Sequence, residues 1–232
     1  MGDVGPPPGR IGVVVGLPQE AAILKRVLGK AVPLLACAGA QPTRAARGAA
    51  DLIAHGATML LSFGFAGGLD ASLRPGDIIV GAGVVGSDGK MRETDDALAQ
   101  RLCAALDEAD CRWSAGLVAG ADQALATAAA KQALAARTGA VIVDMESHAV
   151  AAAGVPFAIL RVVVDPAERA LPASVLAAVD SSGHVKVAAL MAGLLRHPRE
   201  IGVLLALAGD NGPARKSLRR AAAAVGHAFA LK

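Results

Sequence analysis

Short runs of β-branched and other apolar residues alternate along this chain with alanine-rich stretches that repeat with the period of a helix. The apolar runs predict strands at residues 11–16, 31–37, 58–63, 77–85, 116–119, 140–145 and 157–164. Helices are predicted between them, with the clearest at residues 18–27, 42–55, 95–109 and 147–153. Alternating strands and helices are typical of a largely parallel sheet covered by helices, so the pattern predicts the α/β class.

The composition agrees with one globular domain. Of 232 residues, 54% are hydrophobic and 19% are charged, and the formal net charge is +3, which excludes a disordered chain. We expect a flexible N-terminal segment at residues 1–10 and one domain at residues 11–195. Residues 196–232 hold seven Lys or Arg and two acids, a net charge of +5, and are expected to form a basic helical extension packed on that domain.

Several classes of function and location are disfavoured. The three cysteines form no CxxC pair, which predicts a reduced, cytoplasmic protein, and the N-terminus lacks the basic and apolar pattern of a secretory signal. The apolar segments 187–195 and 201–208 are too short to span a bilayer. The five histidines lack ligand spacing, so no metal is expected, and the basic tail lacks interleaved aromatic residues, so no nucleic acid is expected.

Glycines and acids at strand ends are the first candidates for chemistry, because ligands of open α/β sheets bind outside the carboxyl ends of the strands. The run Gly-Phe-Ala-Gly-Gly at residues 64–68 either lets backbone N–H groups approach a ligand or forms a tight turn. Asp144 and Glu146 flank Met145 just before a helix. Such carboxylates either accept hydrogen bonds from a sugar diol or stabilise the N-terminus of the helix.

Two further acids are candidates for proton transfer. Asp165 ends a strongly apolar run, and a partly desolvated acid there would have a raised pKa and could protonate a leaving group. The alternative is a turn-forming Asp before Pro166. Glu20 follows the first strand and is either a general base or an ordinary acid of a first helical turn.

The order of these segments resembles the nucleoside phosphorylase and nucleosidase superfamily, which includes the methylthioadenosine/S-adenosylhomocysteine nucleosidases. The resemblance rests on residues 12–20, 64–69 with 75–78, 144–146 and 155–165, and it covers residues 11–169. It implies a three-layer α/β/α sandwich with a mixed, largely parallel central sheet. It also implies a purine nucleoside phosphorylase-like glycosyltransferase that needs no cofactor.

The resemblance assigns roles to individual residues. Asp165 matches the acid that protonates purine N7, and Glu20 matches the glutamate that activates water in the nucleosidases. Glu146 matches the acid that binds the ribose hydroxyls, and Met145 matches the residue that packs under the sugar. Gly67, together with Phe65, belongs to the loop that passes close to the sugar and the nucleophile.

Departures from the superfamily pattern concern the nucleophile and the substrate. The phosphorylases carry an Arg-x-Gly-Ser/Thr-x-Gly loop, whereas residues 62–67 here are Ser-Phe-Gly-Phe-Ala-Gly. If phosphate is the co-substrate, Arg44 or Arg47 would have to bind it, although both are typical of solvated helix residues. Val164 replaces the serine that precedes the acid in the nucleosidases, which implies an unusually apolar site.

The whole pattern, including residues 144–151, looks like the hopanoid-associated phosphorylase branch. That resemblance implies release of adenine from adenosylhopane by phosphorolysis, in hopanoid lipid biosynthesis, with the basic C-terminus touching the inner face of the membrane. Two alternatives stay open: hydrolysis of methylthioadenosine or S-adenosylhomocysteine, and nucleoside or lipid binding without catalysis. By analogy with relatives, we expect a homo-oligomer.

Overall fold

The computed structural model describes residues 10–170 and 201–229. Its sheet has eight strands: β1 (Ile11–Val15), β2 (Leu34–Cys37), β3 (Met59–Gly68), β4 (Ile78–Val85), β5 (Met91–Glu93), β6 (Trp113–Gly120), β7 (Ile142–Asp144) and β8 (Phe157–Asp165). Apart from Arg10, the segment expected to be flexible at residues 1–10 lies outside this description, as does the apolar segment 187–195.

The sheet is mixed and largely parallel, which confirms the predicted fold class. The strand order is β2-β1-β3-β7-β6-β4-β5, and β8 pairs with both β3 and β4. The antiparallel pairs are β3 with β7, β4 with β5 and β4 with β8, and the other pairs are parallel. The strands β3, β7, β6, β4 and β8 therefore close a ring, with β1 and β2 extending the sheet from β3.

Two register shifts accompany this closure. One lies between Ala66 and Gly67, where β3 pairs with β8, and the other between Gly81 and Gly83, where β4 pairs with β6. An extra residue in one strand bends it and increases its twist. Such bends allow the long strands β3 and β4 to belong to the ring and also to pair with β1 and β5 outside it.

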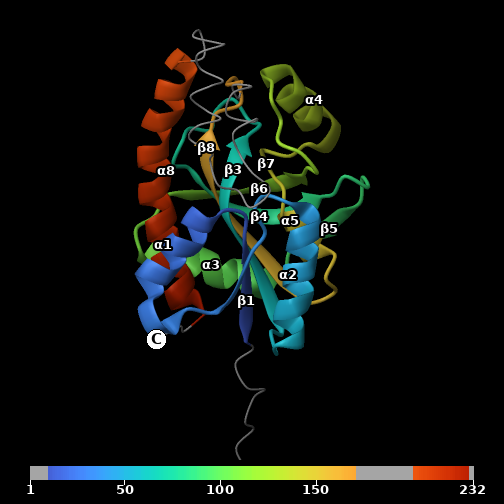
Figure 1. Ribbon diagram of the computed structural model, residues 1–232, viewed down its shortest axis with the longest axis vertical. Coiled ribbons are helices and arrows are strands. Elements are labelled where there is room, and N and C mark those ends of the chain that lie inside the picture. The colour runs from blue at the N-terminus through green and yellow to red at the C-terminus, as the bar shows by residue number, and fades with distance from the viewer. Residues whose placement is uncertain (1–9, 171–200, 230–232) are drawn as a thin grey trace, which may run out of the picture.

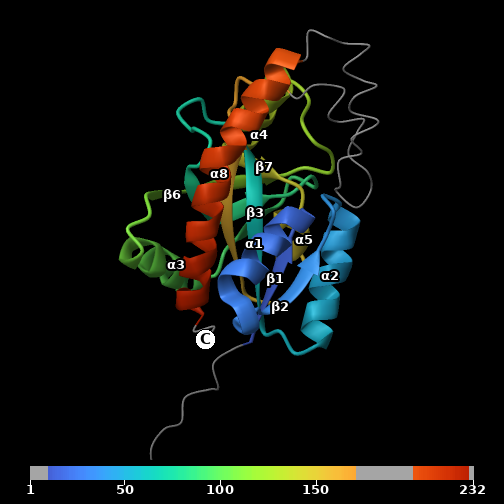
Figure 2. The same ribbon diagram turned by 60° about the vertical axis from the view of Figure 1, so that its left-hand side comes forward.

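Helices cover the sheet as α1 (Pro18–Leu28), α2 (Pro42–Ala54), α3 (Asp96–Glu108), α4 (Ala128–Thr138), α5 (Ser147–Ala151) and α8 (Ile201–Ala228), with a 3₁₀ turn η1 (Gly29–Ala31). Apolar residues of α1, α3 and α8 share one buried cluster with one face of the sheet. Those of α2 and α5 share a second cluster with the other face. The sheet thus lies between two helical layers (Figures 1 and 2).

The predicted boundaries differ from the observed ones at a few places. β3 continues to Gly68 instead of ending at residue 63, so the glycine run is part of a strand and not a free turn. β2 begins at Leu34 instead of residue 31, because the chain first makes η1 and then reaches Pro33, which has no N–H for a strand ladder. The short strand β5 was not predicted and pairs with β4 after the turn at residues 87–90.

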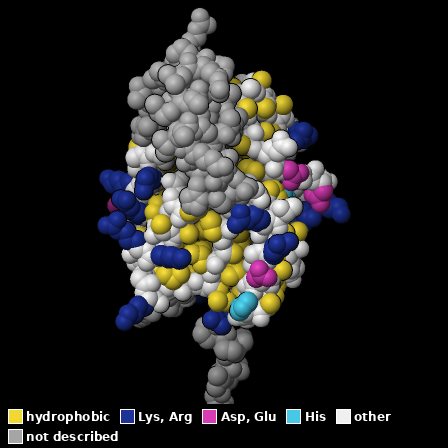
Figure 3. Space-filling view, in the orientation of Figure 1, with side chains coloured by type: hydrophobic (Ala, Val, Ile, Leu, Met, Phe, Trp, Pro, Cys, Tyr) yellow, Lys and Arg dark blue, Asp and Glu magenta, His cyan; other side chains and the backbone are white. Residues whose placement is uncertain are grey.

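α8 joins the C-terminal part of the chain to the core. Its residues Ala214, Leu218, Ala221 and Val225 are fully buried. The exposed side of the same helix carries Arg215, Lys216, Arg219 and Arg220, and Lys and Arg side chains gather on the α8 side of Figure 3. Within residues 10–170 and 201–229, no helix combines the length and apolar character needed to cross a membrane.

Candidate active site

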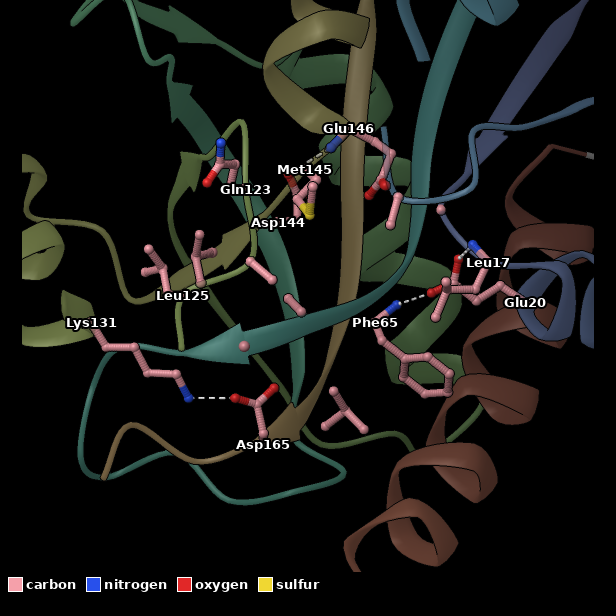
Figure 4. A pocket seen from close by; sticks show the side chains of 17 residues that line it. Leu17, Glu20, Phe65, Gln123, Leu125, Lys131, Asp144, Met145, Glu146 and Asp165 are labelled. Carbon is pink, nitrogen blue, oxygen red and sulfur yellow. Dashed lines mark hydrogen bonds and ion pairs between the residues drawn. The ribbon is translucent and has the colours of Figure 1, made fainter. Parts of the chain in front are cut away.

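A cavity of about 230 Å³ lies where β3, β7 and β8 end, beside the first turn of α1. Four carboxyl groups line it, those of Glu20, Asp144, Glu146 and Asp165, together with the ammonium group of Lys131. The remaining wall is mostly apolar and includes Leu17, Phe65, Leu125, Val143, Met145 and Val164. Figure 4 shows Asp165 with Lys131 on one side of this cavity, Glu20 on another and Glu146 on a third.

Glu20 is held rigidly by backbone donors. Its side chain is buried, the Phe65 N–H donates to Oε1 at 2.7 Å, and the Leu17 N–H donates to Oε2 at 2.7 Å. Gly64 has a φ of +150°, and a Cβ atom there would lie 2.5 Å from the Glu20 carboxyl carbon. Only glycine allows β3 to approach Glu20 this closely. Burial raises the pKa of Glu20, and the charge of Arg161 and the backbone donors oppose that effect.

Arg161 ties the acids of β7 and its following loop to β8. It is fully buried in the middle of β8. Its Nε lies 2.6 Å from Asp144 Oδ2, and its Nη2 lies 3.2 Å from Glu146 Oε2. Arg161 also donates to the hydroxyl of Ser62 at 2.6 Å and to the carbonyl of Phe65 at 3.2 Å. One cation therefore compensates part of the negative charge of a buried acidic cluster.

The carboxyl group of Glu146 has a strongly raised pKa. Burial, with the nearby charges of Asp144 and Glu20, raises its pKa to about 8, against the lowering effect of Arg161. Gly16 makes space for this side chain, because a Cβ atom at that position would lie 2.7 Å from Glu146 Oε1. The carboxyl is thus neutral near pH 7 in the free protein and has a hydrogen to donate as well as oxygens to accept.

We expect Glu146→Gln to change how stability depends on pH. In wild type the folded state keeps the Glu146 proton up to about pH 8, whereas the unfolded state loses it near 4.5. The unfolding free energy of wild type therefore falls as pH rises between these values, and the variant lacks this contribution. The melting temperature of the variant should rise relative to wild type across that window, by about 2–4 °C for each kcal/mol. A difference that stays constant from pH 5 to pH 9 would contradict the raised pKa.

Asp165 is the acid at the end of β8, on the far side of the cavity from Glu20. Its side chain is buried and forms an ion pair with Lys131, which also donates to the carbonyl of Pro166 at 2.8 Å. Burial raises the pKa of Asp165, and the charges of Lys131 and Arg169 act in the opposite direction. A carboxyl that retains its proton above the usual range is suited to general acid chemistry.

The structure brings six of the eight predicted site residues to this one cavity: Glu20, Phe65, Gly67, Met145, Glu146 and Asp165. Arg44 and Arg47 lie elsewhere. They are exposed on α2 and line a groove of about 550 Å³ between that helix and β2. Within residues 10–170 and 201–229, no group of three His, Cys, Asp or Glu side chains is placed to hold a metal ion.

Sequence reasoning missed Arg161 and Lys131. A signal for Arg161 was present, because it is the one charged residue inside the apolar run that forms β8, Phe-Ala-Ile-Leu-Arg-Val-Val-Val-Asp. A buried cation in such a strand requires buried acids beside it. Lys131 gave no such signal, because lysine is an ordinary residue in an alanine-rich helix.

The cavity can protonate one end of a bound molecule while stabilising positive charge at the other. Asp165 supplies a buried proton on one side, and the carboxyl groups of Glu20 and Asp144 provide negative charge on the other. Such pre-positioned charges act most strongly in a site shielded from water. Both features accelerate the heterolysis of a C–N bond in which the carbon becomes positively charged and the nitrogen base leaves.

Comparisons with known proteins identify the family and the fold of the chain. Residues 22–196 match the profile of the Phosphorylase superfamily. A mutant futalosine hydrolase of Helicobacter pylori superposes with a TM-score of 0.66 at 20% identity, covering 81% of this chain and 99% of its own. The 5′-methylthioadenosine/S-adenosylhomocysteine nucleosidase of Campylobacter jejuni gives 0.64 at 20% identity, covering 80% and 95%.

A third similar structure is the S-adenosylhomocysteine nucleosidase of Streptococcus pyogenes, with a TM-score of 0.63 at 21% identity and coverage of 72% and 87%. These likenesses show a shared fold. A search of curated protein sequences gives no match.

Proposed function

Since the chain belongs to the phosphorylase superfamily, we propose that it cleaves the N-glycosidic bond of an adenine nucleoside. The observation that carries the proposal is the placement of Asp165, with its raised pKa, across one cavity from the acids Glu20 and Glu146. The similar structures include proteins described as nucleosidases and a futalosine hydrolase, which supports the same reaction class.

The charges of the cavity match the charges that the reaction develops. As the glycosidic bond breaks, the ribosyl carbon becomes positive and the purine becomes negative. Asp165 donates its proton to the purine, so the base leaves as a neutral molecule. Glu146 binds the ribose hydroxyls, and the carboxylate of Glu20 stabilises the positive carbon and orients the nucleophile.

Water is the nucleophile that this arrangement favours. Each oxygen of Glu20 accepts a backbone N–H, which favours the carboxylate form against the effect of burial, and this carboxylate can accept a proton from water. A phosphate ion would meet four carboxyl groups there, and Lys131 and Arg161 are already paired with acids. Arg44 and Arg47, expected to bind phosphate if it is the co-substrate, line the separate groove on α2.

The 5′-substituent of the nucleoside is proposed to be apolar. The non-acidic wall of the cavity is formed by residues such as Leu17, Phe65 and Val164. Adenosylhopane, the substrate implied by the sequence resemblance, and methylthioadenosine both carry an apolar group at this position. The exposed cations of α8 support contact with anionic headgroups for a lipid-linked substrate, at about 1 kcal/mol for each Lys or Arg.

Four rates test the proposal. Adenine release should be followed with adenosylhopane in detergent and with methylthioadenosine, each with and without phosphate. We expect release that needs no phosphate, and the preferred nucleoside identifies the 5′-group. Release that depends strictly on phosphate would make the protein a phosphorylase, and binding of both nucleosides without release would make it a binding protein. Light scattering of the same preparation measures the expected homo-oligomer.

A further inference from the structure

Lys131 is a buried lysine, and the packing of its own helix does not explain why it is buried. It lies in α4, and its side chain is 1% exposed. The other buried residue of α4 is Leu134, which packs on Leu69, Ala119 and Val143. Burial of an ammonium group is costly unless acceptors surround it, and lysine is seldom fully buried unless it is paired.

Both acceptors of Lys131 belong to the segment that ends β8. The ammonium group contacts Asp165 Oδ2 and donates to the carbonyl of Pro166 at 2.8 Å. In Figure 4 the other oxygen of Asp165 points away from Lys131 and into the cavity. Lys131 thus fixes one carboxyl oxygen and the backbone just after it, while the second oxygen faces the place where a ligand binds.

We propose that Lys131 is a positioning residue for Asp165, which aims the free carboxyl oxygen at the leaving base and makes that carboxyl a stronger acid. The proposal rests on the proposed function, because it assigns Lys131 a part in the same reaction. Asp165 gives its proton to N7 of the purine as the C–N bond breaks, and the electron pair of that bond stays with the base. The resulting Asp165 carboxylate is stabilised by the Lys131 charge, and water returns the proton after the base has left.

Few other charged groups act on Asp165. Arg169, four residues later in the chain, lowers the pKa in the same direction as Lys131. Glu20, Asp144 and Glu146 line the other walls of the cavity. Lys131 contacts the Asp165 carboxyl directly, and an opposite charge at such a distance changes a carboxyl pKa by about 1–3.

The test compares Lys131→Met and Lys131→Arg with wild type, and uses Arg137→Met, which removes an exposed cation from the same helix, as control. Without Lys131, Asp165 is a weaker acid and holds its proton to higher pH. We expect Lys131→Met to lower kcat for the adenine nucleoside by about tenfold or more. The alkaline limb of the kcat profile should move up by about one pH unit or more. Lys131→Arg should restore the wild-type limb, and Arg137→Met should behave as wild type.

A nucleoside analogue separates positioning of the acid from a merely structural role. In 4-nitrophenyl riboside the bond that breaks is C1–O, and its leaving group, 4-nitrophenolate, departs without protonation, so Lys131→Met should cleave it at nearly the wild-type rate. Equal losses on both substrates with an unmoved alkaline limb would overturn the proposal, as would wild-type kcat and an unmoved limb.

Infrared titration of the Asp165 carboxyl provides a readout that needs no turnover, with Asp165→Asn to assign the band. The proposal expects the titration to move to higher pH in Lys131→Met. If wild type released no base but this shift occurred, the proposed function would fail while the effect of Lys131 on Asp165 would be supported. An unshifted titration would overturn the proposal whatever the activity.

Discussion

Asp165→Asn is expected to lower the rate of base release by about 10²–10⁴, the usual contribution of a positioned acid. The amide has nearly the same shape as the carboxyl but cannot supply a proton to the departing purine. The variant also leaves Lys131 with only the Pro166 carbonyl and an amide oxygen as acceptors. The measurement is kcat for adenine release, made on protein whose circular dichroism and melting curve show a folded state.

Glu168→Gln is the matched control for this change. Glu168 is an exposed acid three residues after Asp165, so its loss should leave the rate unchanged. Wild-type turnover by folded Asp165→Asn would remove Asp165 from the mechanism. Equal losses in both variants would point to a general effect of charge.

Glu20→Gln should reduce hydrolysis by a similar factor, about 10²–10⁴, because the nucleophile loses its proton acceptor. The two carboxyl oxygens of Glu20 each accept a backbone N–H, from Leu17 and from Phe65. A glutamine amide can accept only one of these bonds and leaves one buried donor without a partner, which costs about 1–3 kcal/mol of stability. Single-turnover rates of base release should therefore be compared at a temperature well below the melting point.

Asp96→Asn is the corresponding control, since Asp96 is an exposed acid in the first turn of α3, as Glu20 is a buried one in the first turn of α1. If Glu20→Gln hydrolysed nucleosides at the wild-type rate, water activation would have to be assigned to another group. If it lost hydrolysis but kept base release in the presence of phosphate, phosphate would be a competent nucleophile at this site.

The difference between the two variants is informative about the step that each acid serves. A leaving group such as 4-nitrophenolate, which departs without protonation, bypasses Asp165 but still requires attack on the ribosyl carbon. Cleavage of 4-nitrophenyl riboside should therefore be nearly normal in Asp165→Asn and slow in Glu20→Gln. A loss of this activity in both variants would show that the two carboxyl groups do not divide the work as proposed.

Much of the fold could be predicted because the local signals agree with it. Pro18 and Pro42 begin α1 and α2, and the apolar runs of β1, β4 and β8 were placed within one residue of their observed bounds. The closed ring of strands was not predicted. It depends on long-range pairing and on register shifts at Ala66/Gly67 and Gly81/Gly83, for which periodicity along the chain carries no information.

The acids of the candidate site could be predicted because they follow or end predicted strands. Glu20 and Glu146 follow β1 and β7 within a few residues, and Asp165 ends β8. Ligands of open α/β sheets bind outside the carboxyl ends of the strands, so these positions were the ones to search. Lys131 was not predictable, since its burial depends on the long-range contact of its ammonium group with Asp165 and Pro166, 34 and 35 residues later in the chain. Arg44 and Arg47 were chosen for their charge alone, and α2 directs them to another groove.

The most direct test of the central claim is single turnover of methylthioadenosine and of adenosylhopane in water enriched with oxygen-18. Free adenine and the sugar product should be separated and their masses measured by mass spectrometry. Asp165→Asn should be assayed in parallel with wild type. The account predicts free adenine together with a ribose product that carries one heavy oxygen at C1, and little of either from the variant. A sugar phosphate without the label, or intact nucleoside after prolonged incubation with folded wild type, would contradict it.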